Sequence, residues 1–302
     1  MILLIGAKKL WLKLQRRFLQ YSAISLEQPQ WLLMFTFSRI HLIRSLVVRF
    51  TKKPVKLDLG NKNSVFSDLD VDRVVKALKD RGLHLGITIP SNLLPDILDF
   101  AQAATYLGNG DLQFPFLLAD RKTQEIKTNR SFRIGYNFDP ASQCMAIREL
   151  AADPKLWEIA ARYFDSQPML ASTQIWWTFA NDAPAEGRAQ GFYRFHYDLE
   201  DYACVKFMFY LTDVDLTGGP HVCVKGSHKK KKLSHQFSLL RERNDREIRE
   251  YYGDDNVTTI YDRAGVGFVE DPFCFHKGIL PQNSDRLILE FKFTLNNYGM
   301  IL

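Results

Sequence analysis

The chain has 302 residues, with 40 lysines and arginines against 34 acidic residues, so its formal net charge is +6. Hydrophobic residues make up 46% and charged residues 25%, a composition that excludes a disordered chain. The charge is unevenly distributed, because residues 1–56 hold 11 lysines and arginines and a single acid, Glu27. Residues 57–302 therefore carry a net charge of −4, and the basic N-terminal segment needs a separate explanation.

Cysteine usage and hydropathy exclude several other classes. The four cysteines show no CxxC spacing, which excludes a disulfide scaffold and a cysteine-based zinc ribbon and predicts reduced thiols in a cytoplasm. No stretch approaches the roughly 20 apolar residues that a spanning helix needs. Apolar residues 1–7 precede two lysines, which is the reverse of the order in a secretory signal.

The N-terminal segment, residues 1–56, is predicted to be helical. Residues 1–22 form an amphipathic pattern, with leucines and Trp11 on one side and lysines and arginines largely opposite. Trp31–Phe50 is predicted to be a second helix, whose polar residues are spread around it in a way that allows burial on both sides, and residues 51–59 a basic linker. Three interpretations stay open for this segment: an interfacial helix on the inner face of an anionic membrane, packing on the domain, or binding to a partner protein. The first implies an amphipathic or membrane-borne substrate.

Further along the chain, helical patterns give way to strand patterns. Helices are expected at Val71–Arg81, Ser91–Leu107, Ala141–Ala152, Pro154–Tyr163 and within Gln236–Tyr252. From about residue 168, short β-branched and aromatic runs predict strands at Thr173–Ala180, Phe192–Asp198, Val205–Val214, His221–Lys225, Thr258–Tyr261, Gly267–Val269 and Leu287–Leu295. This order predicts a mainly β fold with flanking helices, a sandwich or jelly roll with the helices outside.

The triplet His196-Tyr197-Asp198 is the first candidate for chemistry. Residues i and i+2 of a strand point to the same face, so an imidazole and a carboxylate would converge there. A later histidine would complete a 2-His-1-carboxylate set, which leaves one face of Fe(II) open. The triplet alone decides nothing, because about one such match is expected by chance in a chain of this composition.

The surrounding residues make the triplet more specific. The motifs are Gly191-Phe192-Tyr193-Arg194-Phe195-His196-Tyr197-Asp198, Tyr210-Leu211-Thr212-Asp213, Gly218-Gly219-Pro220, Lys225-Gly226-Ser227-His228, and His276 with Arg286 ten residues later. Over about residues 170–298 the sequence resembles the phytanoyl-CoA hydroxylase family of Fe(II)/2-oxoglutarate dioxygenases, nearest its ectoine-hydroxylase-like branch. It departs from many members at Gly278, where they have a serine.

The resemblance implies a fold, a reaction and the residues that perform it. The fold is a double-stranded β-helix, a cupin-like jelly roll at about residues 168–298, within a dioxygenase domain at 57–302. The reaction is hydroxylation of an unactivated C–H bond of a small or lipid-linked metabolite, with 2-oxoglutarate and O2 as co-substrates and succinate and CO2 as co-products. The residues implied as catalytic iron ligands are His196, Asp198 and His276. Those implied to bind the co-substrate are Arg286, through the distal carboxylate, Thr178 and, on the same strand face, Gln174.

Two alternatives stay open at this point. One is a non-catalytic jelly-roll binding module at the membrane surface, against which the intact triad argues. The other is a cupin-type metal enzyme that does not use 2-oxoglutarate, against which Arg286 argues, because such enzymes need no dicarboxylate clamp. No nucleic-acid motif accompanies the basic segment, so a nucleic-acid partner is not expected.

Overall fold

The computed structural model describes residues 28–57, 63–180, 194–238 and 241–298. Its helices are α2 (Pro29–Phe37), α3 (His41–Phe50), α4 (Val71–Arg81), α5 (Leu94–Ala103), α6 (Arg121–Thr128), α7 (Pro140–Gln143), α8 (Met145–Ala151), α9 (Pro154–Phe164), α10 (Leu233–Gln236) and α11 (Asp245–Tyr252). None of the helices in these ranges is long and apolar enough to cross a membrane.

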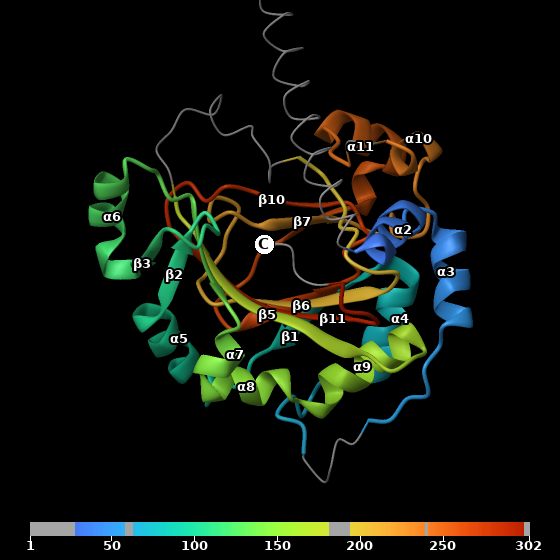
Figure 1. The fold of residues 1–302 in the computed structure, drawn as a ribbon, viewed down its shortest axis with the longest axis horizontal. Helices are drawn as coiled ribbons and strands as arrows, with labels where there is room; N and C mark the ends of the chain where they lie inside the picture. Colours follow the sequence, from blue (N-terminus) through green and yellow to red (C-terminus); the bar gives the residue numbers. More distant parts are fainter. Residues whose placement is uncertain (1–27, 58–62, 181–193, 239–240, 299–302) are drawn as a thin grey trace, which may run out of the picture.

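Two antiparallel sheets form the centre of the molecule (Figure 1). The strands are β1 (Leu83–Thr88), β2 (Thr105–Gly108), β3 (Pro115–Leu117), β4 (Ile134–Phe138), β5 (Met169–Thr178), β6 (Cys204–Tyr210), β7 (His221–Val224), β8 (Val257–Ile260), β9 (Val266–Glu270), β10 (His276–Gly278) and β11 (Arg286–Thr294). The larger sheet has the order β1-β9-β6-β11-β5-β4-β2-β3, and the smaller has the order β10-β7-β8. The two sheets face each other as the halves of a jelly roll, which confirms the predicted fold class.

Strand β11 shows how the sequence separates the core from the site. Its side chains alternate between two faces, as the pleat of a strand requires. Leu287, Leu289, Phe291 and Phe293 point to the helix-covered side and belong to the main hydrophobic core. The alternate residues at positions 286, 288, 290 and 292 line a cavity between the sheets, and three of those four are charged.

Helices α4, α5, α8 and α9 cover the outer face of the larger sheet, below it in Figure 1. Their buried aliphatic residues complete the core that β11, β5 and β6 begin. Burying each large apolar side chain contributes about 1.5–3 kcal/mol. Helix α4 begins at the predicted position, where the Asp70 side chain accepts from the backbone of Arg73, and it ends at Gly82, whose φ of 70° suits glycine.

The N-terminal segment differs from the prediction where the structure describes it. Its second predicted helix is two helices, α2 and α3, separated at Ser38–Ile40. Trp31 and Met34 of α2 pack into a second hydrophobic cluster with Phe195 and Phe275, which flank the iron motif. This part of the segment is therefore joined to the catalytic domain. The predicted helix at residues 1–22 lies outside the described residues.

Two other predicted elements were wrong in part, and strand β4 was not predicted. The helix predicted at Ser91–Leu107 ends at Ala103, and residues 105–108 form β2, because Tyr106 is buried in the core and β3 and β4 supply partners. Residues 134–138 are strand β4. The strand predicted at Phe192–Asp198 is reduced to isolated bridges in its described part.

Candidate active site

Backbone pairing brings the three predicted ligands together. His196 and His276 exchange two backbone hydrogen bonds, with N···O distances of 2.9 and 2.8 Å. The Asp198 N–H donates to the carbonyl of Pro272 at 2.9 Å, so the two segments run antiparallel and align their side chains. The ligand atoms of the two histidines and the aspartate all lie within 4.8 Å of one another. The facial set predicted from the sequence is thus assembled, although Asp198 follows an isolated bridge rather than a regular strand.

The two imidazoles are oriented by backbone carbonyls. Nδ1 of His196 lies 3.0 Å from the carbonyl of Arg194, and Nδ1 of His276 lies 3.0 Å from the carbonyl of Cys274. Because a carbonyl can only accept, Nδ1 carries the proton in each ring and Nε2 keeps its lone pair. Nε2 of His276 lies 3.6 Å from Asp198 Oδ2, and Nε2 of His196 lies 4.0 Å from Oδ1. This arrangement is typical of metal-binding histidines.

The protonation states also suit a divalent metal. Burial, with His276 beside it, lowers the pKa of His196 to about 4, so the ring is neutral at neutral pH. Burial alone would raise the pKa of Asp198, but Lys206 and the two histidines hold it well below its ordinary value. A metal needs neutral imidazoles and an ionised carboxylate. The donor set and its charge therefore fit Fe(II), for which two histidines and one carboxylate are a known ligand set.

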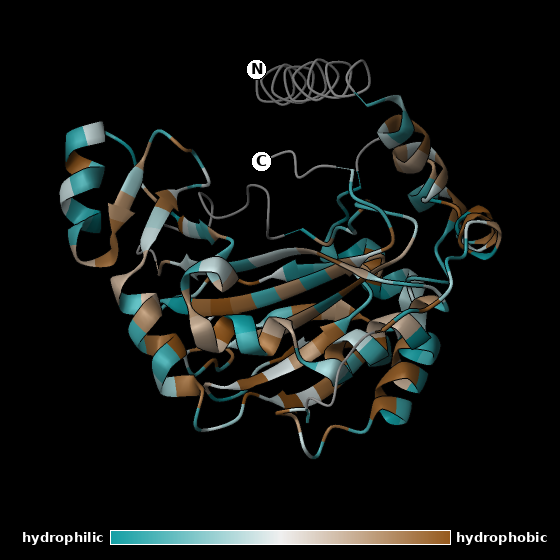
Figure 2. Cartoon of the chain, turned by 60° about the horizontal axis from the view of Figure 1, so that its bottom comes forward, coloured by the Kyte–Doolittle hydropathy of each residue, from teal (hydrophilic) through white to brown (hydrophobic). Residues whose placement is uncertain are grey.

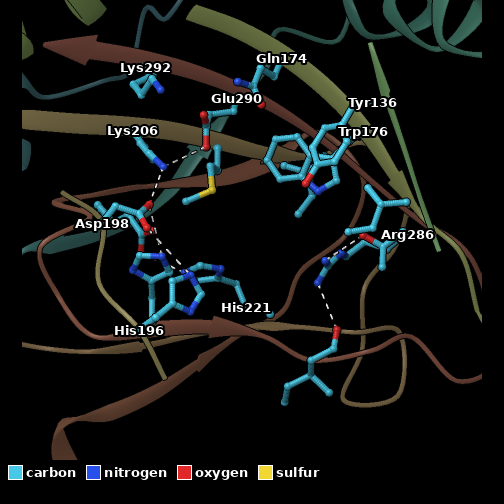
Figure 3. Close-up of a pocket in the computed structure, with 18 of the residues that line it drawn as sticks. Tyr136, Gln174, Trp176, His196, Asp198, Lys206, His221, Arg286, Glu290 and Lys292 are labelled. Carbon is cyan, nitrogen blue, oxygen red and sulfur yellow. Dashed lines mark hydrogen bonds and ion pairs between the residues drawn. The ribbon is translucent and has the colours of Figure 1, made fainter. Parts of the chain in front are cut away.

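Arg286 lies across the cavity from these ligands (Figure 3). It pairs with Thr178 in the register of β11 and β5, and its Nη2 donates to Thr178 Oγ1 at 3.1 Å. Nη1 donates to the carbonyl of Gly219 and, at 3.4 Å, to that of Ile279. The guanidinium is thus positioned at the wall of a cavity of about 300 Å³. The predicted pair of Arg286 and Thr178 is brought together, facing the same space as the three ligands.

Gln174 lines the same cavity at a different place. It pairs with Glu290 in the β5–β11 register, four residues along the strand from Thr178. Four residues of a strand span about 13 Å, so Gln174 is not beside Arg286. In Figure 3 it lies near Glu290 and Lys292, on the side of the cavity away from the guanidinium. Gln174 therefore lines the same cavity as the three ligands, and its contact with the co-substrate stays a prediction.

A buried network of charges was missed by the sequence interpretation. Lys206 Nζ lies 2.8 Å from Asp198 Oδ2, 3.4 Å from Glu200 Oε1 and 3.8 Å from Glu290 Oε2. Lys292 Nζ lies 3.1 Å from Glu200 Oε2. The signal was present in the sequence, because these charges stand at alternate positions of the otherwise apolar strands β6 and β11. Charges at inward positions of a strand mark a polar interior.

Removing Lys206 is expected to destabilise the metal-free protein. Lys206→Met would leave Asp198, Glu200 and Glu290 without their shared cation, and an uncompensated buried charge costs about 3–5 kcal/mol. Chemical denaturation at neutral pH measures the loss. The matched control is Lys76→Met in α4, which breaks an exposed pair with Asp80 and is expected to change stability little, because solvent screens exposed ion pairs. Equal denaturation midpoints for the two variants would contradict this account.

With this geometry established, comparison with known proteins decides the family. A family model described as phytanoyl-CoA dioxygenase (PhyH) matches residues 72–278, well over half of the chain. The chain belongs to this family. It is therefore a 2-oxoglutarate-dependent non-haem iron dioxygenase, as the sequence predicted, with Fe(II) as its metal and 2-oxoglutarate as its co-substrate. No curated protein matches the chain.

Solved structures with the same fold include several enzymes of this kind. The 2-oxoglutarate-dependent epimerase SnoN from nogalamycin biosynthesis is 14% identical, with 76% of this chain and 87% of that chain covered and a TM-score of 0.54. HygX from Streptomyces hygroscopicus, with nickel and 2-oxoglutarate bound, is 15% identical, with 76% and 89% covered and a TM-score of 0.50. EctD from S. alaskensis is also 15% identical, with 80% and 82% covered and a TM-score of 0.49. At these identities the likeness is one of fold.

Proposed function

We propose that this enzyme hydroxylates an unactivated C–H bond of a small or lipid-linked metabolite and releases succinate and CO2. The observation that carries the proposal is the convergence of His196, Asp198, His276 and Arg286 on one cavity of about 300 Å³. Fe(II) held by the two histidines and the aspartate would supply, with 2-oxoglutarate and O2, the oxidising power that this reaction requires. The residues of the chain bind and orient the co-substrate and the substrate, and they exclude water from the cavity.

Arg286 and Thr178 would hold the distal carboxylate of 2-oxoglutarate. A guanidinium offers paired donors that match a carboxylate, and the Thr178 hydroxyl adds a third donor beside it. Gly278 faces the guanidinium, and a Cβ at this position would make an ordinary contact, at 3.5 Å, with Arg286 Nη2. The hydroxyl that many relatives have there is missing, so the clamp of this chain depends more heavily on Arg286.

The charged side of the cavity would receive the substrate. Gln174, Glu290 and Lys292 lie on the side of the cavity away from Arg286 (Figure 3), and Lys206 lies between Glu290 and the iron ligand Asp198. Burial raises the pKa of Glu290, so its protonation can adapt to a bound group. Such a wall favours a substrate part that carries hydrogen-bonding or charged groups over a plain hydrocarbon chain. Contact with the substrate is the role we assign to Gln174.

Isotope labelling tests the reaction type. The iron-loaded enzyme is incubated with 2-oxoglutarate, heavy-isotope O2 and a panel of amino acid derivatives, glycans and acyl chains, and the products are analysed by mass spectrometry. Hydroxylation predicts one labelled oxygen in succinate and one in the product, with a polar member of the panel as the best substrate. A product that forms with succinate but contains no labelled oxygen would overturn hydroxylation and leave the dioxygenase assignment intact.

A further inference from the structure

Helix α3 turns its apolar side away from the protein. Leu42, Leu46 and Phe50 recur every four residues, which places them on one face, and they are 68%, 43% and 82% exposed. The opposite side carries Arg44, which is 7% exposed and lies with its guanidinium carbon 3.6 Å from the ring centre of Phe273. An ordinary surface helix buries its apolar stripe and exposes its charges. We call the exposed side of Leu42, Leu46, Arg49 and Phe50 the α3 face.

Exposed apolar side chains are concentrated in this part of the described chain. Seven of the 17 large hydrophobic side chains exposed in the described residues lie between positions 32 and 55. They are Leu32, Leu33, Phe37, Leu42, Leu46, Phe50 and Val55. Helices α2 and α3 stand at the outer edge of the molecule (Figure 1), and hydrophobic residues, in brown, stand among hydrophilic ones at the right-hand edge of Figure 2. Exposed apolar side chains that gather in one short part of a chain, rather than being scattered singly over the surface, are a mark of an interaction site.

The charge of the same segment identifies the kind of partner. Residues 28–57 contain six lysines and arginines and no aspartate or glutamate. Arg49 belongs to the α3 face, and Lys52 and Lys56 follow it as exposed residues. An apolar helix face bordered by basic residues is the pattern of helices that lie in a membrane interface. Each basic residue near an anionic bilayer adds to the attraction.

Two other occupants fit the charge less well. A second copy of the chain docking by a two-fold axis would bring the same basic residues opposite each other. Residues 1–27 contain five lysines and arginines and only one acid, so they would also meet like charge on this surface. A bilayer rich in anionic lipid offers acyl chains to the apolar stripe and negative headgroups to its basic border. We therefore propose that the α3 face, with the exposed part of α2, docks on an anionic lipid bilayer.

Vesicle co-sedimentation of the full chain tests this proposal. The native protein is expected to sediment with vesicles of phosphatidylcholine mixed with phosphatidylserine, more weakly with phosphatidylcholine alone, and less in high salt. Leu42→Gln, Leu46→Gln and Phe50→Gln, combined, are expected to weaken binding to the mixed vesicles at least about tenfold, because glutamine keeps the helix but removes the apolar face. Iron-dependent succinate formation without lipid should not change, since these residues lie far from the cavity lining.

Helix α6 offers matched controls. Ile126 is 81% exposed, and Lys122 and Lys127 are exposed nearby. Ile126→Gln should leave vesicle binding unchanged. The double variant Lys122→Gln/Lys127→Gln should weaken vesicle binding less than the double variant Arg49→Gln/Lys56→Gln. Native protein that ignores anionic vesicles, or a triple glutamine variant that binds them as the native chain does, would overturn the proposal. A triple variant that changes the oligomeric mass and not lipid binding would assign this face to a second copy instead.

Discussion

Replacing Asp198 with alanine is expected to lower the affinity for Fe(II) by about 100-fold or more and to abolish succinate formation. The reason is that Asp198 is the single carboxylate among the three converging ligand atoms. Losing even an outer partner of a metal ligand typically costs 10–100-fold in metal affinity or activity, and losing the ligand itself should cost at least as much. Calorimetric titration of the metal-free protein with Fe(II) under nitrogen measures the affinity.

The variant Asp198→Ala also frees Lys206 from one of its partners, so folding has to be followed separately. Thermal unfolding of the metal-free variant shows whether lost affinity reflects lost structure. Asp255→Ala, at an exposed site in the short 3-10 helix after α11, is the matched control and should bind iron as the native chain does. Near-native iron affinity in folded Asp198→Ala would contradict the assignment of this carboxylate as a ligand.

Replacing Arg286 with glutamine is expected to weaken 2-oxoglutarate binding by roughly 100-fold or more. Each hydrogen bond to a charged group contributes about 1.5–3 kcal/mol, and a guanidinium facing a carboxylate makes two. The variant Arg286→Lys keeps the charge and should lose less, and Thr178→Val should lose about tenfold, since it removes one hydroxyl donor. Titration with 2-oxoglutarate in the presence of Ni(II) measures binding without turnover.

Arg286 also donates to the carbonyls of Gly219 and Ile279, so its replacement can change the local fold. This effect has to be separated from the loss of the contact with the 2-oxoglutarate carboxylate. The affinity for Ni(II) alone provides the separation, because the metal ligands lie across the cavity and should keep their affinity in Arg286→Gln. Arg263→Gln, at an exposed site, serves as a control for loss of a positive charge. An unchanged dissociation constant for 2-oxoglutarate in Arg286→Gln would show that other residues bind its distal carboxylate.

The iron motif could be predicted from the sequence because its geometry is mostly local. His196 and Asp198 are two residues apart, and the position of His276 followed from the resemblance to the family. Thr178 and Arg286 were also implied by the resemblance, and the register of β5 and β11 places them opposite each other. What could not be predicted was the pairing of His196 with His276, which joins segments 80 residues apart.

The charged network and the short strands were missed for different reasons. Lys206 and Lys292 lie in predicted strands, but their partners come from two segments, residues 198–200 and β11. Only the folded sheet shows that all these charges face one cavity. Strands β2 and β10 are four and three residues long, too short for an alternating pattern to distinguish them from the end of a helix or a loop. Their partners, rather than their own propensity, make them strands.

The outward orientation of helix α3 is a third feature that could not be predicted from the sequence. Its apolar and basic residues were visible in the sequence, and burial on both sides was the natural expectation for so apolar a segment. The position of Arg44 against Phe273 turns the helix so that Leu42, Leu46 and Phe50 remain exposed. Which face of an amphipathic segment is buried depends on this tertiary contact. The proposed membrane contact is therefore made by the α3 face and the exposed part of α2, rather than by residues 1–56 as a whole.

Iron-dependent formation of succinate from 2-oxoglutarate tests the central claim most directly. The purified chain is loaded with Fe(II) and supplied with 2-oxoglutarate and O2 but no substrate. It is expected to form succinate and CO2 slowly and in equal amounts. This activity should disappear on adding a chelator and in His276→Ala, and return when Fe(II) is restored to the native chain. A folded, iron-loaded protein that neither binds 2-oxoglutarate nor forms succinate would contradict the account.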